Sequence, residues 1–419
     1  MRRLIVLFAL FFSGCGLEGY LHHTFNSSHP YPQIKESEKA IPADEPVLMS
    51  LDQLQSNRTK SLKSGSVNEG IRSRVIERAN LALSQTPPSV TDSPVLYENQ
   101  AAHDYASLAI YWWPDPSAAD GKPYIRRDGD INPEVEDYDY PKLTMMVESV
   151  RALALAGYFS GDSTYHKAAG KYLNTWFCDP STRMNPNLNF AQGIPGRTEG
   201  RNYGIIDTYH FIYLLDAVYL LRAESQLPNE IHSCMQSWFS DFNHWLLTSE
   251  FGIREANTLN NHGTWYDAQL VAFTTFTGQH ELAKRILSDI TSNRILRHID
   301  ADGRQPREMR RADGTHYLIY NLEAYKNLIR YGRFHGINLF LVEDERSGGL
   351  IVAIDFVNQE VSLLEPDNPY SLYWLIIRAQ MLGESIQVTP RIADLLKEEY
   401  LPDVAALSVT LSHKKSSAR

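Results

Sequence analysis

Apolar residues recur at helical spacing along most of this chain, beginning near Val67. The stretch YPKLTMMVESVRALALAGYFSGD places Leu143, Met146 and Val150 on one stripe, as expected for an amphipathic helix with one face on a core. Pro141 stands at its start, where proline is tolerated because first-turn N–H groups have no partner within the helix. The pattern predicts a long helix that begins at this proline.

Other segments show the same period. Residues 67–85 carry apolar side chains at four-residue steps, and residues 204–226 are apolar almost all round, which predicts a helix in the protein interior. Alternating strand patterns are scarce, and the best candidate is GGLIVAID at residues 348–355. Further helical runs are expected at 229–247, 265–289, 316–336, 341–358, 369–382 and 391–399.

Two long segments lack the helical period, and both are rich in Pro, Asn, Gly and aromatic residues: 103–140 and 179–204. Loops of this length inside a compact domain are usually functional. No linker marks a domain boundary after residue 90, and the chain has no exact internal repeat. We therefore expect an all-α fold, with one large domain of stacked helical hairpins over residues 46–402 and the long loops gathered at one end.

The two ends of the chain are expected to lie outside this domain. Residues 1–14 are typical of a secretory signal, since their apolar run is too short to span a bilayer. With the next two residues they read MRRLIVLFALFFSGCG. Its ending resembles the lipobox of bacterial lipoproteins, which implies cleavage before Cys15 and lipid on that cysteine; an ordinary signal peptide is the alternative. Residues 15–45 then form a polar tether, and residues 403–419 a polar tail. We expect a periplasmic protein that its lipid anchors to the membrane.

The composition is that of a globular protein, with 43% apolar and 11% aromatic residues among 419. The net charge of −10 argues against nucleic acid as a partner, although a local Arg cluster can still bind an anion. Cys178 and Cys234 could pair in an oxidising compartment or remain two buried thiols, and neither has metal-ligand spacing. The protein is expected to be a monomer.

The stretch NNHGTWYD places two amides beside an imidazole. One interpretation is a helix start, in which an Asn caps the first turn. The other is a site where the amide of Asn261 holds a substrate carboxylate while His262 handles a proton.

The stretch DGRQPREMRRADGTHYLIYNLEA concentrates arginines in an acidic protein, and Arg310 and Arg311 precede Tyr317 by about two turns. A solvated charge run is one interpretation. Alternatively, an Arg beside a Tyr favours the phenolate, because a nearby cation stabilises the charged form. A phenol tuned in this way can transfer protons at neutral pH.

Together these groups suit β-elimination on a uronate. Removal of the proton alpha to a carboxylate requires that carboxylate to be neutralised, and an amide, an imidazole and a guanidinium are suitable donors. Hydrolysis by a carboxylate pair is a competing mechanism, with candidates Asp104, Glu199, Asp207 and Asp267. Metal ligation through His103 with Asp104, or His262 with Asp267, is a weaker alternative, since no HxH or HExxH spacing is present.

Four stretches, HDYASLAIYWWPDP, MNPNLNFAQGIPG, NNHGTWYD and QPREMRR…THY…NLEA, together resemble the alginate-lyase-like polysaccharide lyase superfamily, most of all its branch of glucuronan and mannuronan lyases. The resemblance runs from Pro46 to Leu401. It implies an incomplete (α/α) toroid with an open cleft, and metal-free β-elimination of a uronic-acid polymer without a cofactor. The products would carry 4,5-unsaturated uronate ends.

The resemblance also implies the catalytic residues, which fall on Asn261, His262, Arg311 and Tyr317. The chain doubles the family's single Arg, so Arg310 is an alternative that could instead contact substrate. An α/α-toroid hydrolase and a non-catalytic polysaccharide-binding lipoprotein remain the other candidate functions.

Flanking residues are predicted to bind the anionic polysaccharide. For the Arg and Gln side chains the alternative is a loop-fixing hydrogen bond, and for the aromatic side chains it is buried packing. The predicted set is Gln192, Arg197, Arg201, Tyr105, Trp112, Trp113 and His103. On mannuronate or glucuronate, H5 and O4 leave from the same side, so Tyr317 could act first as base and then as acid. On guluronate or iduronate, His262 would be the base on the opposite face.

Overall fold

A computed structural model describes residues 45–363 apart from 95 and 98, together with 369–383, 386–388 and 409–411. The predicted signal segment, Cys15 and nearly all of the tether lie outside the described residues, as does the helix expected at 391–399. The longer helices are α2 (Leu51–Lys60), α3 (Val67–Ser84), α4 (Tyr140–Ser160), α5 (Ser163–Leu173), α6 (His210–Ala223), α7 (Asn229–Thr248), α9 (Asn261–Phe276), α13 (Gly314–Phe334), α14 (Gly349–Ser362) and α15 (Pro369–Leu382). The shorter helices are α8 (Glu250–Ala256), α10 (His280–Arg285), α11 (Ser292–His298) and α12 (Pro306–Met309).

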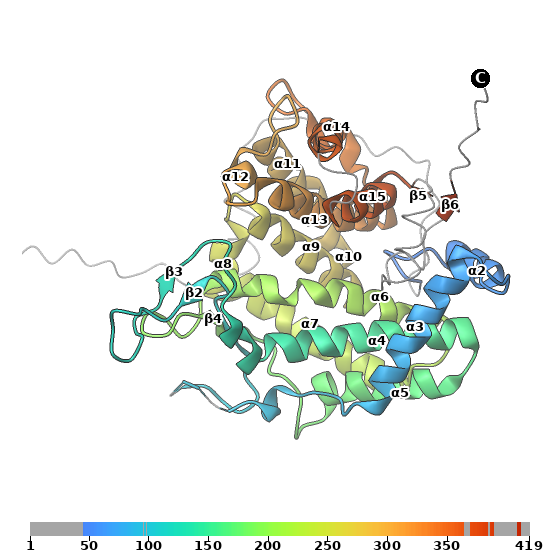
Figure 1. The fold of residues 1–419 in the computed structure, drawn as a ribbon, viewed down its shortest axis with the longest axis horizontal. Helices are drawn as coiled ribbons and strands as arrows, with labels where there is room; N and C mark the ends of the chain where they lie inside the picture. The colour runs from blue at the N-terminus through green and yellow to red at the C-terminus, as the bar shows by residue number, and fades with distance from the viewer. Residues whose placement is uncertain are drawn as a thin grey trace, which may run out of the picture.

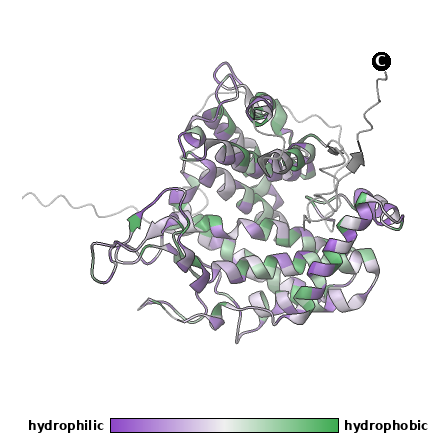
Figure 2. Cartoon of the chain, viewed as in Figure 1, coloured by the Kyte–Doolittle hydropathy of each residue, from purple (hydrophilic) through white to green (hydrophobic). Residues whose placement is uncertain are grey.

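The longer helices pack in two layers. The inner helices α4, α6, α9 and α13 contact one another in that order, while α3 and α5 pack on α4, α7 on α9, and α14 and α15 on α13. Figure 2 shows hydrophobic residues concentrated along α6 and mainly hydrophilic ones in the loops around β2 and β3. The expectation of an all-α fold built from stacked helices is therefore confirmed.

The inner position of α6 follows from its sequence. The segment from Asn202 to Ala223, which joins the 3-10 helix η4 (Asn202–Tyr209) to α6, is apolar and long enough to pass as a membrane span. Since 83% of its most apolar window is buried inside the protein, it is a core helix of the toroid, as the sequence predicted.

Helix boundaries mostly agree with the sequence. Ser66 caps α3 by accepting a hydrogen bond from the backbone N–H of Glu69, and Gly161 ends α4 at a φ of 75°, which glycine adopts without strain. The expected run at 265–289 is divided after α9, where Gly278 adopts a φ of 75°. Beyond it lie α10 and a π-helical segment, Ile286–Thr291.

One expectation near the C-terminal end is corrected. The strand candidate at 348–355 is wrong, because these residues begin α14, whose core-facing Leu350, Ala353, Ile354 and Val357 follow a helical rather than an alternating period. Within the expected polar tail, the described residues form strand β6 (Val409–Leu411), which pairs in parallel with β5 (Ile386–Val388).

The long loops contain short strands that the sequence did not predict. Strand β1 (Ala106–Leu108) pairs in parallel with β4 (Phe190–Gly193), and β2 (Trp112–Trp113) pairs with β3 (Ile125–Arg126). The pairing of β1 with β4 joins the two long loops, and Figure 1 shows β2, β3, β4, α8 and α12 at the same end of the molecule. Loops far apart in sequence therefore meet beside the starts of α9 and α13.

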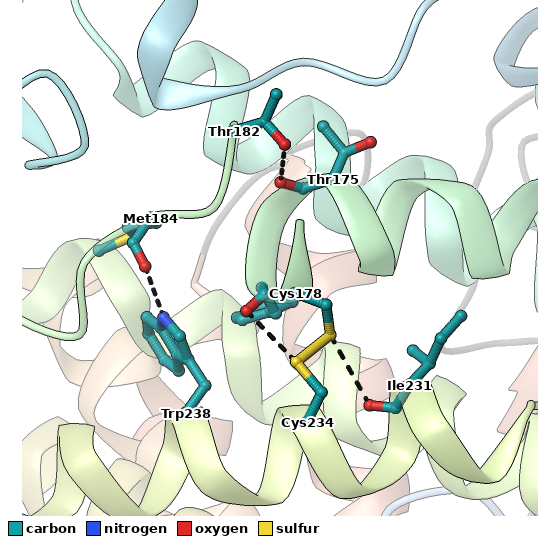
Figure 3. The surroundings of a disulfide bond; sticks show 8 residues. Thr175, Cys178, Thr182, Met184, Ile231, Cys234 and Trp238 are labelled. Carbon is teal, nitrogen blue, oxygen red and sulfur yellow. Dashed lines mark hydrogen bonds between the residues drawn. A yellow bond between two sulfur atoms is a disulfide. The ribbon is translucent and has the colours of Figure 1, made fainter. Parts of the chain in front are cut away.

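Cys178 and Cys234 form a disulfide, which closes a separation of 56 residues with a Cα–Cα distance of 5.9 Å. Figure 3 shows this bond between the end of the π-helical segment Asn174–Cys178 and α7. Beside it the indole N–H of Trp238 donates to the backbone oxygen of Met184 at 2.7 Å. Of the two possibilities left open by the sequence, the pairing is the one observed, and it fixes the start of the second long loop to α7.

Candidate active site

The four stretches singled out in the sequence contact one another. Tyr111, in the first loop, lies with its hydroxyl 3.0 Å from that of Tyr317. The backbone N–H of Asn261 donates to Glu308 at 2.7 Å, which joins the third stretch to the fourth. Asn202, which follows the second long loop's strand β4, donates to Glu255 at 2.7 Å, and Glu255 binds the third stretch.

The sequence left open whether an Asn here caps a helix or serves the site, and the structure separates Asn260 from Asn261 in this respect. The side-chain oxygen of Asn260 accepts the backbone N–H of His262 and caps α9. Asn261 is buried, and its amide nitrogen donates to Glu308 at 2.5 Å, so its backbone N–H and one of its two side-chain N–H groups are directed by the same carboxylate. Burial raises the pKa of Glu308, while the two bonds from Asn261 and the charges of His262 and Arg311 oppose that shift. The amide group is thus fixed independently of the helix cap.

His262 is oriented by a second buried glutamate. Its Nδ1 lies 2.7 Å from Oε1 of Glu255, whose side chain is completely buried, and Asn202 donates to the other carboxylate oxygen. The ring of Tyr203 packs edge-on against the imidazole, with centroids 4.8 Å apart. Because an ionised carboxylate only accepts hydrogen bonds, Nδ1 carries a proton. Nε2 is the ring atom left for a substrate, and it can donate to a carboxylate only when the imidazole carries a second proton.

Arg311, rather than Arg310, contacts Tyr317. Its Nη2 donates to the phenolic oxygen at 2.8 Å and its guanidinium lies 3.9 Å from the centre of the phenol ring. The same nitrogen donates to Asp128 at 3.2 Å. Arg310 is exposed at the start of the turn that leads to α13. Asp313 caps that helix by accepting the N–H of His316, so α13 begins three residues before Tyr317.

Opposing effects set the pKa of Tyr317. Burial raises the pKa of the phenol, and the contact with Tyr111 adds to the increase. Arg311 lowers that pKa, as expected for a cation, but its effect is outweighed. In the free protein the phenol is therefore protonated at neutral pH, although Arg311 shifts its pKa in the direction that the sequence analysis expected.

Gln192 adopts a left-handed backbone conformation with a φ of 48°, which is uncommon outside glycine and asparagine. Ser107 Oγ accepts its N–H at 2.7 Å, and Asp207 accepts its side-chain amide at 2.8 Å. Arg201 donates to its side-chain oxygen at 2.7 Å and lies over the ring of Tyr203. These bonds give Gln192 and Arg201 a loop-fixing role. Strained residues cluster at functional sites, so binding of substrate by these two residues stays a prediction.

The remaining predicted binding residues have structural partners. Arg197 donates to the backbone oxygen of Tyr124 and stacks over the half-buried Trp112. Trp113, also half-buried, lies beneath the guanidinium of Arg127. These contacts fix the first loop and leave a substrate role for Arg197, Trp112 and Trp113 as a prediction.

Two predicted binding residues lie away from any exposed wall. Tyr105 is completely buried and donates to Asp207, so it packs in the interior rather than in a stacking surface. Nδ1 of His103 lies 2.6 Å from the backbone oxygen of Arg183, a contact that joins the first long loop to the second.

The carboxylates considered for hydrolysis or metal binding have other roles. Asp267 forms a buried pair with Arg294, with N–O distances of 2.7 and 2.9 Å. Asp207 accepts from Ser107, Gln192 and Tyr105. Asp104 accepts the amides of Asn185 and Asn187, while Glu199 is exposed. In the part of the chain that the structure describes, no group of three or more His, Cys, Asp or Glu side chains could hold a metal ion.

The fold and this set of groups, an amide, an imidazole, a guanidinium and a phenol at one end of a helical toroid, define a polysaccharide lyase. The model of the alginate lyase family matches residues 89–367, and the chain belongs to that family. The chain is similar to an alginate lyase from Bacteroides ovatus, whose crystal structure shares 30% identity with a TM-score of 0.75 and covers 85% of this chain and 95% of its own.

A more distant similarity supports the fold alone. Alginate lyase A1-III from Sphingomonas species A1 shares 17% identity with a TM-score of 0.52, over 86% of this chain and 93% of its own. The curated proteins contain no match.

Proposed function

We propose that this lyase cleaves a uronic-acid polymer, mannuronan (alginate) or glucuronan, by metal-free β-elimination that leaves 4,5-unsaturated uronate ends. The observation that carries the proposal is the hydrogen bond of 2.8 Å from the Arg311 guanidinium to the Tyr317 hydroxyl. The backbone N–H of Arg311 donates to the backbone oxygen of Glu308, whose carboxylate holds Asn261. The similarity to the alginate lyase from Bacteroides ovatus, at 30% identity, supports the same substrate class.

Asn261 and His262 would neutralise the uronate carboxylate at the cleaved sugar. Loss of the C5 proton places negative charge on that carboxylate, and fixed donors stabilise the charge most when they need no reorganisation. The two buried glutamates provide this fixation, since Glu308 holds the amide and Glu255 holds the imidazole. The neutralisation therefore uses side chains of the protein and needs no metal.

Tyr317 would move the protons. On a polymer whose H5 and O4 leave from one side, its oxygen takes the C5 proton and then returns a proton to the departing O4. The guanidinium of Arg311 donates to that oxygen and favours the transient phenolate, whereas burial and Tyr111 keep the resting phenol protonated. The phenol must therefore lose its own proton to solvent before it can act as base, and the proton that it then takes from C5 is the one that it returns to O4.

The test is a panel of mannuronan, guluronan and glucuronan incubated with the purified protein. Elimination produces a conjugated double bond, so ultraviolet absorbance and new reducing ends should increase together on mannuronan or glucuronan. A strong chelator should leave the rate unchanged. New reducing ends without the absorbance would contradict β-elimination and favour a hydrolase.

We further propose that the protein is anchored in the periplasm by lipid on Cys15. The sequence before Cys15 supports this, and the disulfide between Cys178 and Cys234 suits an oxidising compartment. The multiple acyl chains of a bacterial lipoprotein should hold it firmly to the membrane. Cys15→Ser should release the protein into the soluble fraction after osmotic shock, and an unaltered protein that is already soluble would contradict the anchor.

A further inference from the structure

A second pocket, of about 460 Å³, lies beside the candidate active site and has no role in the chemistry described above. Its walls come from α11, α12 and the segment around residue 345, and they include Arg297, Arg307 and Arg346. Volumes of several hundred cubic ångströms are typical of sites for small ligands.

The pocket shares its wall with the active site. Leu259 lines it and is separated from Asn261 by a single residue. Arg307 lines it and directly precedes Glu308, the carboxylate that holds Asn261. Figure 1 shows α11 and α12 next to each other at the end of the molecule that carries α8. These two chain segments place the pocket next to the residues that hold Asn261.

The arginines of the pocket are available for an anion. Arg297 and Arg307 are exposed, and within the described residues neither forms an ion pair with a carboxylate. Nη1 of Arg307 donates to the backbone oxygen of Arg297 at 3.2 Å, which places its guanidinium beside the second arginine. The pKa of the neighbouring His298 is lowered, first by burial and then by the positive charge of Arg294, Arg307 and Arg297.

The two aspartates of the pocket do not cancel this charge. Asp344 uses one oxygen to accept the N–H groups of Arg346 and Ser347, and its other oxygen lies 3.7 Å from the guanidinium of Arg346, whose side chain is 81% exposed. The backbone of Asp300 holds its turn by donating to Arg304 and accepting from Gly303. With three guanidinium groups and two carboxylates, the lining carries one net positive charge in a protein of net charge −10.

We propose that this pocket is a distal subsite that binds the carboxylate of a uronate residue one or more sugars away from the cleaved bond, with Arg297 and Arg307 as its ligands. Guanidinium groups recognise carboxylates through paired N–H donors, and an arginine is always charged. The proposal rests on the proposed function, and it adds that this enzyme uses chain length to gain affinity.

The test compares wild type with the double variant Arg297→Gln/Arg307→Gln on oligomannuronates of increasing length. The KM for long chains should increase about tenfold, as expected for the loss of a charge-assisted hydrogen bond. The KM for the shortest cleaved oligomer and kcat at every length should change less than twofold. Arg74→Gln/Arg78→Gln, on the outer helix α3, removes the same charge far from the pocket and should leave the length dependence unchanged.

Equal KM values for wild type and the pocket variant at every length would overturn the proposal, as would an equal increase at every length or in the α3 control. If wild type cleaves no polyuronate, the proposed function is wrong. The subsite is then tested by binding alone. Calorimetry measures the affinity of the Tyr317→Phe protein for a long oligomannuronate, with and without the two Arg changes. A loss of affinity with those changes supports the subsite, and equal or absent binding contradicts it.

Discussion

The carboxylate of Glu255 accepts a hydrogen bond from Nδ1 of His262 at 2.7 Å, and it does so from a completely buried position. The contact fixes the imidazole ring and leaves Nε2 free for a substrate carboxylate. A buried glutamate six residues before Asn261 thus fixes the histidine of the Asn–His pair, while Glu308 fixes its amide.

Glu255→Gln should lower kcat by roughly tenfold or more while KM changes little, because the imidazole loses its charged acceptor and its fixed orientation. Glu255→Asp keeps the carboxylate and should recover part of kcat. Glu250→Gln on the same helix is the matched control, since its side chain is 72% exposed. Initial rates across substrate concentrations decide the matter, and an unchanged kcat for a folded Glu255→Gln protein would remove this role.

The two neighbouring arginines should differ sharply. Arg311→Gln removes the donor to the Tyr317 oxygen and should reduce kcat/KM by roughly a hundredfold. Arg310→Gln alters an exposed side chain and should stay within a few-fold of wild type. If kinetics on the preferred polymer gave the opposite order, Arg310 would be the functional residue.

The raised pKa of Tyr317 predicts an alkaline activity profile. Since the phenol must lose its proton to act as base, the active fraction of the free enzyme should increase about tenfold per pH unit below that pKa. The profile of kcat/KM should therefore rise from neutral to alkaline pH until the fold is lost.

Tyr111 helps to raise that pKa, so Tyr111→Phe should move the rising limb to lower pH. The measurement is kcat/KM across this range for both proteins. A flat profile would exclude Tyr317 as the group whose deprotonation limits the reaction.

The disulfide should contribute about 4 kcal/mol to the free energy of unfolding, because it closes a long loop in the unfolded chain. Cys178→Ser/Cys234→Ser should lose about this amount in denaturant unfolding followed by circular dichroism. A reducing agent should destabilise wild type similarly and leave the double variant unaffected. Equal midpoints for the two oxidised proteins would show that the bond does not stabilise the fold.

The helical part of the fold was predictable because its signal is local. The stripe of Leu143, Met146 and Val150 and the all-round apolarity of α6 define one buried face and one buried helix without any knowledge of their partners. The strand expectation at 348–355 failed because a short apolar run is compatible with both the helical and the alternating period. In the structure these residues form α14, which packs against α13.

The candidate site was predictable only where its residues lie in distinctive stretches. Asn261, His262, Arg311 and Tyr317 stand in such stretches, whereas Glu255 and Glu308 look like ordinary helix-surface glutamates. Asp128 and Tyr111 lie about 200 residues before their partners, and only the folded loops bring them together. The Tyr111 hydroxyl occurs inside the quoted stretch HDYASLAIYWWPDP, so that stretch was the one available signal for it.

The measurement that tests the division of labour between Tyr317 and His262 uses initial rates of wild type, Tyr317→Phe and His262→Gln on mannuronan or glucuronan and on guluronan, with circular dichroism to confirm folding. On the first two polymers Tyr317→Phe should lose roughly a hundredfold or more of turnover, while His262→Gln, which keeps a hydrogen-bond donor, should retain some activity. On guluronan, where His262 would have to be the base, the Gln variant should be inactive. A folded Tyr317→Phe protein with near wild-type turnover would contradict the account.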